Sequence, residues 1–216
     1  SAAAEPDGIY SWNHTCTGAN RFLIVGVSML SVAGSSVTSI TYNSVVLTKI
    51  GHVASVSGAV RAELWGLIAP ATGSNAITVT LSTALDSIGC AVSFTGVHQT
   101  SPTEGFNTAT ATNVGAADAT VDVTTVANND WVVDQVATDD TAITVGAGQT
   151  SRNNVTGAGG SGADSTEPDT TPSTVTMSWG AVAALATWSI VAVALRPVTA
   201  AAVGGTGGED WPKFQR

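Results

Sequence analysis

The chain has 216 residues, a mass of 21.5 kDa and a formal net charge of −9, and only 11% of its residues are charged while 44% are apolar. So acidic a chain, with no stripe of Lys or Arg residues, is repelled by phosphate backbones, and we expect no nucleic-acid binding. The longest apolar runs, such as 190–195, fall far short of the about 20 residues that a bilayer span needs, so we also expect no membrane insertion.

Apolar residues alternate with threonine and serine along most of the chain, and 31 threonines stand against two lysines. A period of two residues predicts β-strands, and β-branched threonine suits a solvated sheet face. No segment combines a helical period with caps at both ends. We therefore predict about twelve strands, at 9–16, 21–30, 37–42, 45–51, 59–69, 75–82, 86–97, 119–126, 130–138, 143–152, 173–180 and 186–196.

Two kinds of strand can be distinguished by their patterns. Ile77, Val79 and Leu81 alternate with threonine, which indicates one buried face, whereas 22–27 and 188–195 are apolar on both faces and should be central strands. Many short strands joined by polar turns favour an all-β fold, a two-sheet antiparallel β-sandwich of jelly-roll type that spans 1–198 as one domain. The stretches 98–118 and 153–172 are expected to be long connections.

The C-terminal residues differ from the rest in composition. A Gly/Ala linker at 199–208 precedes a segment in which Trp211 and Phe214 flank Pro212. A linker of this composition has almost nothing to bury, so the two aromatic residues are the candidate anchors of an arm. A tether of about ten residues reaches roughly 15–20 Å, which suits exchange between neighbouring copies. Docking on its own sheet is the alternative.

Two cysteines, Cys16 and Cys90, allow one disulfide bridge. If 10–16 and 88–94 each present alternate residues to one core, both thiols could meet there. Two buried free thiols that pack as small apolar groups are the alternative.

Motifs for catalysis or cofactor binding are weak. The glycines at 157–162 match a dinucleotide-binding pattern, but no helix follows to hold a pyrophosphate. The three histidines, His14, His52 and His98, lack metal-ligand spacing, and no serine lies in a Gly-x-Ser-x-Gly turn. We therefore expect no catalytic residues, no cofactor and no resident metal. Five carboxylates offer oxygen ligands for Ca²⁺, although solvated turns explain them better: Asp139, Asp140, Asp164, Glu167 and Asp169.

Among the six tryptophans, Trp65 is the candidate for an exposed platform. It shares a strand face with Arg61 and Glu63, and charged neighbours suggest a rim position. Exposed aromatic residues among charges are typical of protein interfaces. These three residues are the predicted ligand or interface platform.

Several motifs together resemble a widespread β-sandwich module, jelly-roll-like, of bacterial surface proteins and of phage or metagenomic structural proteins. They are Trp12–Thr15, Asn20–Ser28, Val37–Asn43, Leu47–Thr48, Glu63–Trp65, Ala91–Val97, Gly146–Thr150 and Trp188–Ile190. The resemblance implies a non-enzymatic building block and brings no catalytic residues with it. Asn43-Ser44 stands where the module usually has Asn-Gly, so a hairpin that is looser or of another type is expected there. The residues from Val198 onward lie outside the module.

These observations predict a structural subunit that pairs with copies of itself or with another coat or surface protein, as a homo-oligomer at an extracellular, cell-surface or virion location. The Ser-Ala-Ala-Ala start suits removal of a targeting segment, and trimming of the sequence explains it equally well. The alternative function is a carbohydrate-binding or adhesive module that uses Trp65 and the connections 98–118 or 153–172 to hold a glycan.

Overall fold

The fold consists of antiparallel β-strands. The computed structural model describes residues 1–5, 7–30, 34–112, 117–157, 159–180 and 182–198, and the backbone of 213–215. The described residues contain no helix, and hence none with the length and apolar character of a membrane span. The all-β prediction is therefore confirmed.

The strands form four sheets rather than two. In the N-terminal half, an outer sheet has the order β2-β8-β4-β5 and an inner sheet the order β1-β9-β3-β7-β6, with β18 also paired to β9. The bounds of these strands are β1 Ala2–Glu5, β2 Ile9–Cys16, β3 Phe22–Leu30, β4 Val37–Tyr42, β5 Val45–Val46, β6 Thr48–Ala54, β7 Val60–Ile68, β8 Gly73–Leu81, β9 Ser87–Thr95 and β18 Lys213–Gln215.

The C-terminal half repeats this arrangement. Its inner sheet has the order β10-β17-β12-β15-β14 and its outer sheet the order β11-β16-β13. The bounds are β10 Thr103–Thr112, β11 Ala119–Thr124, β12 Asp130–Thr138, β13 Thr144–Val145, β14 Thr150–Gly157, β15 Gly160–Asp169, β16 Thr174–Gly180 and β17 Thr187–Leu195.

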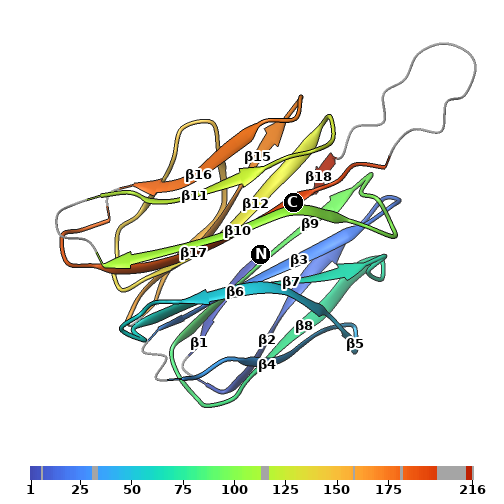
Figure 1. Cartoon of the computed structure of the whole chain (residues 1–216). Helices are drawn as coiled ribbons and strands as arrows, with labels where there is room; N and C mark the ends of the chain where they lie inside the picture. Colours follow the sequence, from blue (N-terminus) through green and yellow to red (C-terminus); the bar gives the residue numbers. More distant parts are fainter. Residues whose placement is uncertain are drawn as a thin grey trace, which may run out of the picture.

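The four sheets are stacked as layers, outer, inner, inner and outer (Figure 1). Three hydrophobic clusters separate them. One lies within the first sandwich (β2 to β9) and includes Met29 and Ile77, and one lies within the second sandwich (β10 to β17) around Trp179. The third joins the two inner sheets and includes Phe94 and Val193. The molecule is thus two β-sandwiches packed face to face.

This stacking explains the two kinds of strand. β3 and β17 are buried at every residue because each lies in an inner sheet that is covered on both faces. The prediction of central strands at 22–27 and 188–195 is confirmed. β8 and β16 lie in outer sheets and alternate between buried apolar residues and more exposed polar ones.

The two sandwiches share one topology and are related by a local two-fold arrangement. β2, β3, β4, β6, β7, β8 and β9 correspond in order to β11, β12, β13, β14, β15, β16 and β17. Where the chain leaves β9 and β17, Val97 pairs with Pro197 as an antiparallel bridge, His98 N donates to Arg196 O and Val198 N donates to Gly96 O. The segment that follows β9 is therefore paired with the segment that follows β17 at this bridge.

Several sequence predictions need correction. The expected two-sheet sandwich of about twelve strands is wrong in its number of sheets and omits strands, because the apolar-polar pattern is weak in edge strands and in polar inner strands. The predicted connection 98–118 contains β10, and the predicted loop 153–172 contains the end of β14 and all of β15. By contrast, the predicted bounds 9–16, 37–42 and 130–138 agree with the structure.

The Asn43-Ser44 turn is tight rather than loose. Asn43 and Ser44 have φ angles of 48° and 65°, and Tyr42 pairs with Val45 directly across the turn. Two consecutive positive φ angles are the geometry of the two-residue hairpin for which Asn-Gly is preferred. The expectation of a hairpin that is looser or of another type is wrong, and Ser44 adopts the strained angle in place of glycine.

Candidate functional site

The predicted platform at Trp65 is buried. Trp65 is 6% exposed and belongs to the core of the first sandwich. It sits on β7, and the side chain of Lys49, from its partner strand β6, covers it with Nζ 4.8 Å from the ring centroid. The prediction of an exposed platform is wrong because the outer sheet and Lys49 cover this face.

Arg61, Glu63 and Trp65 do come together, but around a buried carboxylate. Glu63 is fully buried. Its carboxylate accepts hydrogen bonds from Arg61 Nε at 2.6 Å, Lys49 Nζ at 2.8 Å and Trp65 Nε1 at 3.0 Å. Val37 N donates to it at 3.3 Å. Burial alone would raise the pKa of Glu63, but the hydrogen bonds and charges of Lys49 and Arg61 together outweigh burial and lower that pKa. This Glu63 cluster joins β4, β6 and β7 and is a structural network.

Cys16 and Cys90 are both buried and free. Cys16 lies in the core of the first sandwich, as does Ala91. Because side chains alternate along a strand, Cys90 points the other way from Ala91, toward the second inner sheet, as Val92 does. The bridge does not form because the sheet separates the thiols, and the alternative of two buried free thiols is the one present in this structure. Burial raises the pKa of the Cys90 thiol well above its usual value.

The strongest candidate for a functional site is the backbone edge of β9. One edge of β9 pairs with β3, and the other edge is shared by two short segments, β1 and β18. Ala2 to Glu5 pair with Cys90 to Ser87, and Ser1 exchanges hydrogen bonds with Ala91 at 2.8 and 3.0 Å. Lys213, Phe214 and Gln215 pair with Thr95, Phe94 and Ser93. The two segments therefore lie end to end along one strand, and we term 213–215 the arm segment.

This placement decides part of the arm prediction. The arm segment pairs with its own chain, so the alternative in which it docks on its own sheet is the one present in this structure. Trp211 and Pro212 lie outside the described residues, and of Phe214 only the backbone is described. The structure contains one chain, so pairing between copies stays a prediction.

Side chains of β2 support the point where β1 and β18 meet. Ser1 Oγ lies 2.9 Å from His14 Nδ1 and accepts from Trp12 Nε1 at 3.1 Å, and His14 Nε2 lies 3.1 Å from Ser93 Oγ. Burial, and then the positive charge at Ser1, lower the pKa of His14 to about 4. At neutral pH an uncharged His14 therefore connects Ser1, which precedes β1, with Ser93, which pairs with β18.

The same edge in the second sandwich is filled differently. β17 corresponds to β9, and its edge pairs with the single strand β10 through nine residue pairs, from Thr103 opposite Leu195 to Thr112 opposite Thr187. Lys213 opposite Thr95 is the counterpart of Thr103 opposite Leu195, and Glu5 opposite Ser87 is the counterpart of Thr112. β18 and β1 together therefore cover the edge of β9, as β10 alone covers the edge of β17.

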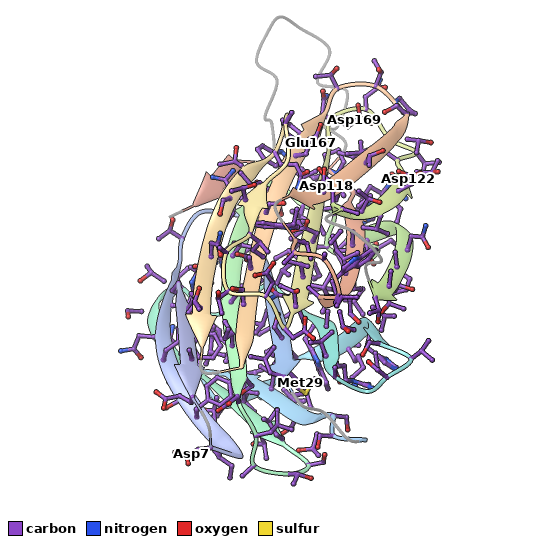
Figure 2. The ribbon with its side chains drawn as sticks, turned by 90° about the vertical axis from the view of Figure 1, so that its left-hand side faces the viewer. Asp7, Met29, Asp118, Asp122, Glu167 and Asp169 are labelled. Carbon is purple, nitrogen blue, oxygen red and sulfur yellow. The ribbon has the colours of Figure 1, made fainter. Side chains whose placement is uncertain are left out.

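The aspartates considered as Ca²⁺ ligands have partners within the chain. Asp139 accepts from Thr187 N, Asp140 from Ala183 N, Asp164 from Asn153 Nδ2 and Asp169 from Thr125 Oγ1 and Ser173 Oγ. Acidic residues of the second sandwich, Asp118, Asp122, Glu167 and Asp169, lie toward one end of the molecule and Asp7 toward the other (Figure 2). Among the described residues, no three His, Cys, Asp or Glu side chains group as metal ligands.

A groove of about 700 Å³ runs between the two sandwiches, along β6 and β7 on one side and β10 and β17 on the other. Its walls are mainly apolar, with Phe22, Ile68 and Phe106 among them. Two charged residues line it, but Lys49 is bonded to Glu63, and Glu104 accepts from Val126 N and Ala127 N. The charges at this groove are thus engaged in holding the fold.

No known protein family, curated protein or solved structure matches the chain. The candidate site therefore depends on geometry alone. Sequence reasoning found the arm but not its acceptor, and the signal for β1 is limited to three alanines.

Proposed function

We propose that the chain is a non-enzymatic structural subunit that self-assembles into, or decorates, an extracellular, cell-surface or virion structure through sheet edges and its C-terminal arm. The observation that carries this proposal is the composite edge of β9, where a three-residue segment from the far end of the chain completes a sheet. Strand addition to a sheet edge is a general mode of protein association, because backbone hydrogen bonds provide the affinity.

The packing of the molecule supports a structural role. Two inner sheets buried on both faces give a continuous core through four layers, and 44% apolar residues with 11% charged residues supply it. We also propose that each sandwich is of jelly-roll type. The pairs β3·β9 and β4·β8 enclose β6·β7 in sequence, and such nesting is what a rolled-up hairpin produces.

The carbohydrate-binding alternative loses its support, since Trp65 is 6% exposed and its polar neighbours bind one another. Sugar platforms need an accessible ring face. We therefore do not propose a glycan ligand.

Electron microscopy of the purified chain at increasing concentration, with sedimentation velocity on the same samples, tests the proposed function. We expect particles or filaments, or oligomers that grow with concentration. A chain that stays monomeric up to millimolar concentration would overturn the proposal.

A further inference from the structure

We propose that the β9 edge from Thr95 to Ser93 is an acceptor site for the arm segment of a second copy of this chain, which takes the place of the chain's own arm segment. This inference rests on the proposed function and names the partner and the site through which assembly occurs. Three features of the structure support it.

The first feature is the crossing of strands between sandwiches. After β9, the chain crosses the bridge at Val97 and Pro197 and forms β10 on the edge of β17, in the other sandwich. The arm segment, which follows β17 in the sequence, pairs with the edge of β9. Each sandwich thus has its edge completed by a segment that follows the other sandwich. The edge from Thr95 to Ser93 therefore pairs with a segment that follows the other sandwich, whereas β1 fills the rest of this edge of β9.

The second feature is the length of the two connections. Residues 96–102 join β9 to β10, whereas 196–212 join β17 to β18. At most about 3.5 Å per residue, seven residues span about 25 Å and seventeen span about 60 Å. The shorter connection restricts β10 to the neighbouring sandwich. The longer one permits the arm segment to reach an acceptor on another copy.

The third feature is the short backbone pairing between the arm segment and β9. β18 forms three residue pairs with β9, against nine pairs between β10 and β17. The rest of the edge is retained by β1, whose position Trp12 and His14 secure through Ser1. Release of the arm segment therefore exposes a short gap in an otherwise complete edge, and a second arm segment of the same sequence fits this gap in the same register.

Exchange of this kind depends on concentration. The chain's own arm segment is tethered, and for a tether of this length its effective concentration at the acceptor is on the order of 1 mM. At about 10 µM chain, the arm segment of another copy occupies about one acceptor in a hundred, and near 1 mM it occupies about half. The chain's own arm segment acts as a cap in dilute solution, and crowding on a surface or particle favours exchange.

Disulfide trapping between two variants of the full chain tests the inference. Thr95→Cys and Lys213→Cys place one thiol on each member of a residue pair, in separate chains. We expect a disulfide-linked heterodimer on mixing, with a trapped fraction of chains that rises about fiftyfold from 10 µM to 1 mM. A chain that carries both substitutions should instead close on itself at 10 µM.

Two controls match this design. Ser57→Cys places a thiol in an exposed turn away from β9, and it should give no heterodimer with Lys213→Cys. Gln215→Pro, in the chain that carries Lys213→Cys, removes the backbone donor opposite Ser93 and should abolish trapping with Thr95→Cys. If the mixture assembles but no heterodimer forms, the inference is wrong while the proposed function stands. If no assembly occurs at any concentration, both are wrong.

Discussion

Replacement of Glu63 by Gln tests whether the residues around Trp65 hold the fold rather than a ligand. The fully buried Glu63 carboxylate accepts four hydrogen bonds, two of them from the cations Lys49 and Arg61 at 2.8 and 2.6 Å. Glutamine removes the negative charge, turns an N–H group toward donors and leaves Arg61 without its counter-charge. Loss of one partner of a buried ion pair costs about 3–5 kcal/mol of unfolding free energy.

A loss of this size is measurable by urea unfolding followed through tryptophan fluorescence. For a chain of this length it corresponds to a fall in Tm of about 6–20 °C. Glu5→Gln, at an exposed position of β1, is the matched control and should change stability by less than about 0.5 kcal/mol. If Glu63→Gln costs less than about 1 kcal/mol, the reasoning about this cluster is refuted.

Three further substitutions test other parts of the fold by urea unfolding. Ser44→Gly should raise the free energy of unfolding by about 0.5–1 kcal/mol, because glycine adopts a φ of 65° without strain, and a loss would contradict the assigned turn. Gly26→Val should cost about 1–3 kcal/mol, because a Cβ at Gly26 meets the Gln135 amide between the inner sheets; unchanged stability would argue against that contact. Burial raises the pKa of Asp134 to about 7, so this carboxyl prefers to be protonated in the folded chain. Its contribution to stability is complete below about pH 4 and is lost as pH rises through 7, by up to about 3 kcal/mol from pH 5 to pH 8, and Asp134→Asn should reduce that loss. An equally steep pH dependence in Asp134→Asn would exclude Asp134 as its source.

The sequence predicts well those strands in which burial alone sets the pattern. In β2, β4 and β12, apolar residues recur where a core lies on one or both faces, and turn residues flank them. In β15, by contrast, Ser161, Asp164 and Ser165 are buried between other strands and hydrogen-bond to polar partners. A strand of small polar residues reads as a loop, because its burial depends on partners that are distant in the sequence.

The four-layer stack is not deducible from local pattern. A run that is apolar on both faces, such as β3, indicates cover on two sides but not whether a third sheet or a helix supplies it. The error at Trp65 has the same origin. The charges of Arg61 and Glu63 predict a solvent-exposed face. In the structure the Glu63 carboxylate is instead buried, because Arg61 and Lys49 neutralise it and donate hydrogen bonds to it.

The acceptor edge of β9 likewise depends on contacts between residues about 120 positions apart, Lys213 with Thr95. The aromatic residues of the arm were visible in the sequence, but the partner of the arm segment was not. Backbone pairing leaves no signature in the acceptor strand, because any sequence except proline donates and accepts in the ladder.

Sedimentation velocity of the full chain beside a chain that ends at Val198 tests the central claim most directly. Because the arm segment pairs with only three residues of β9, its removal should leave the fold and its circular dichroism spectrum intact. We predict that the full chain forms species larger than a monomer as concentration approaches 1 mM, and that the chain ending at Val198 remains monomeric or assembles far more weakly. Identical sedimentation of the two chains across that range would contradict the account.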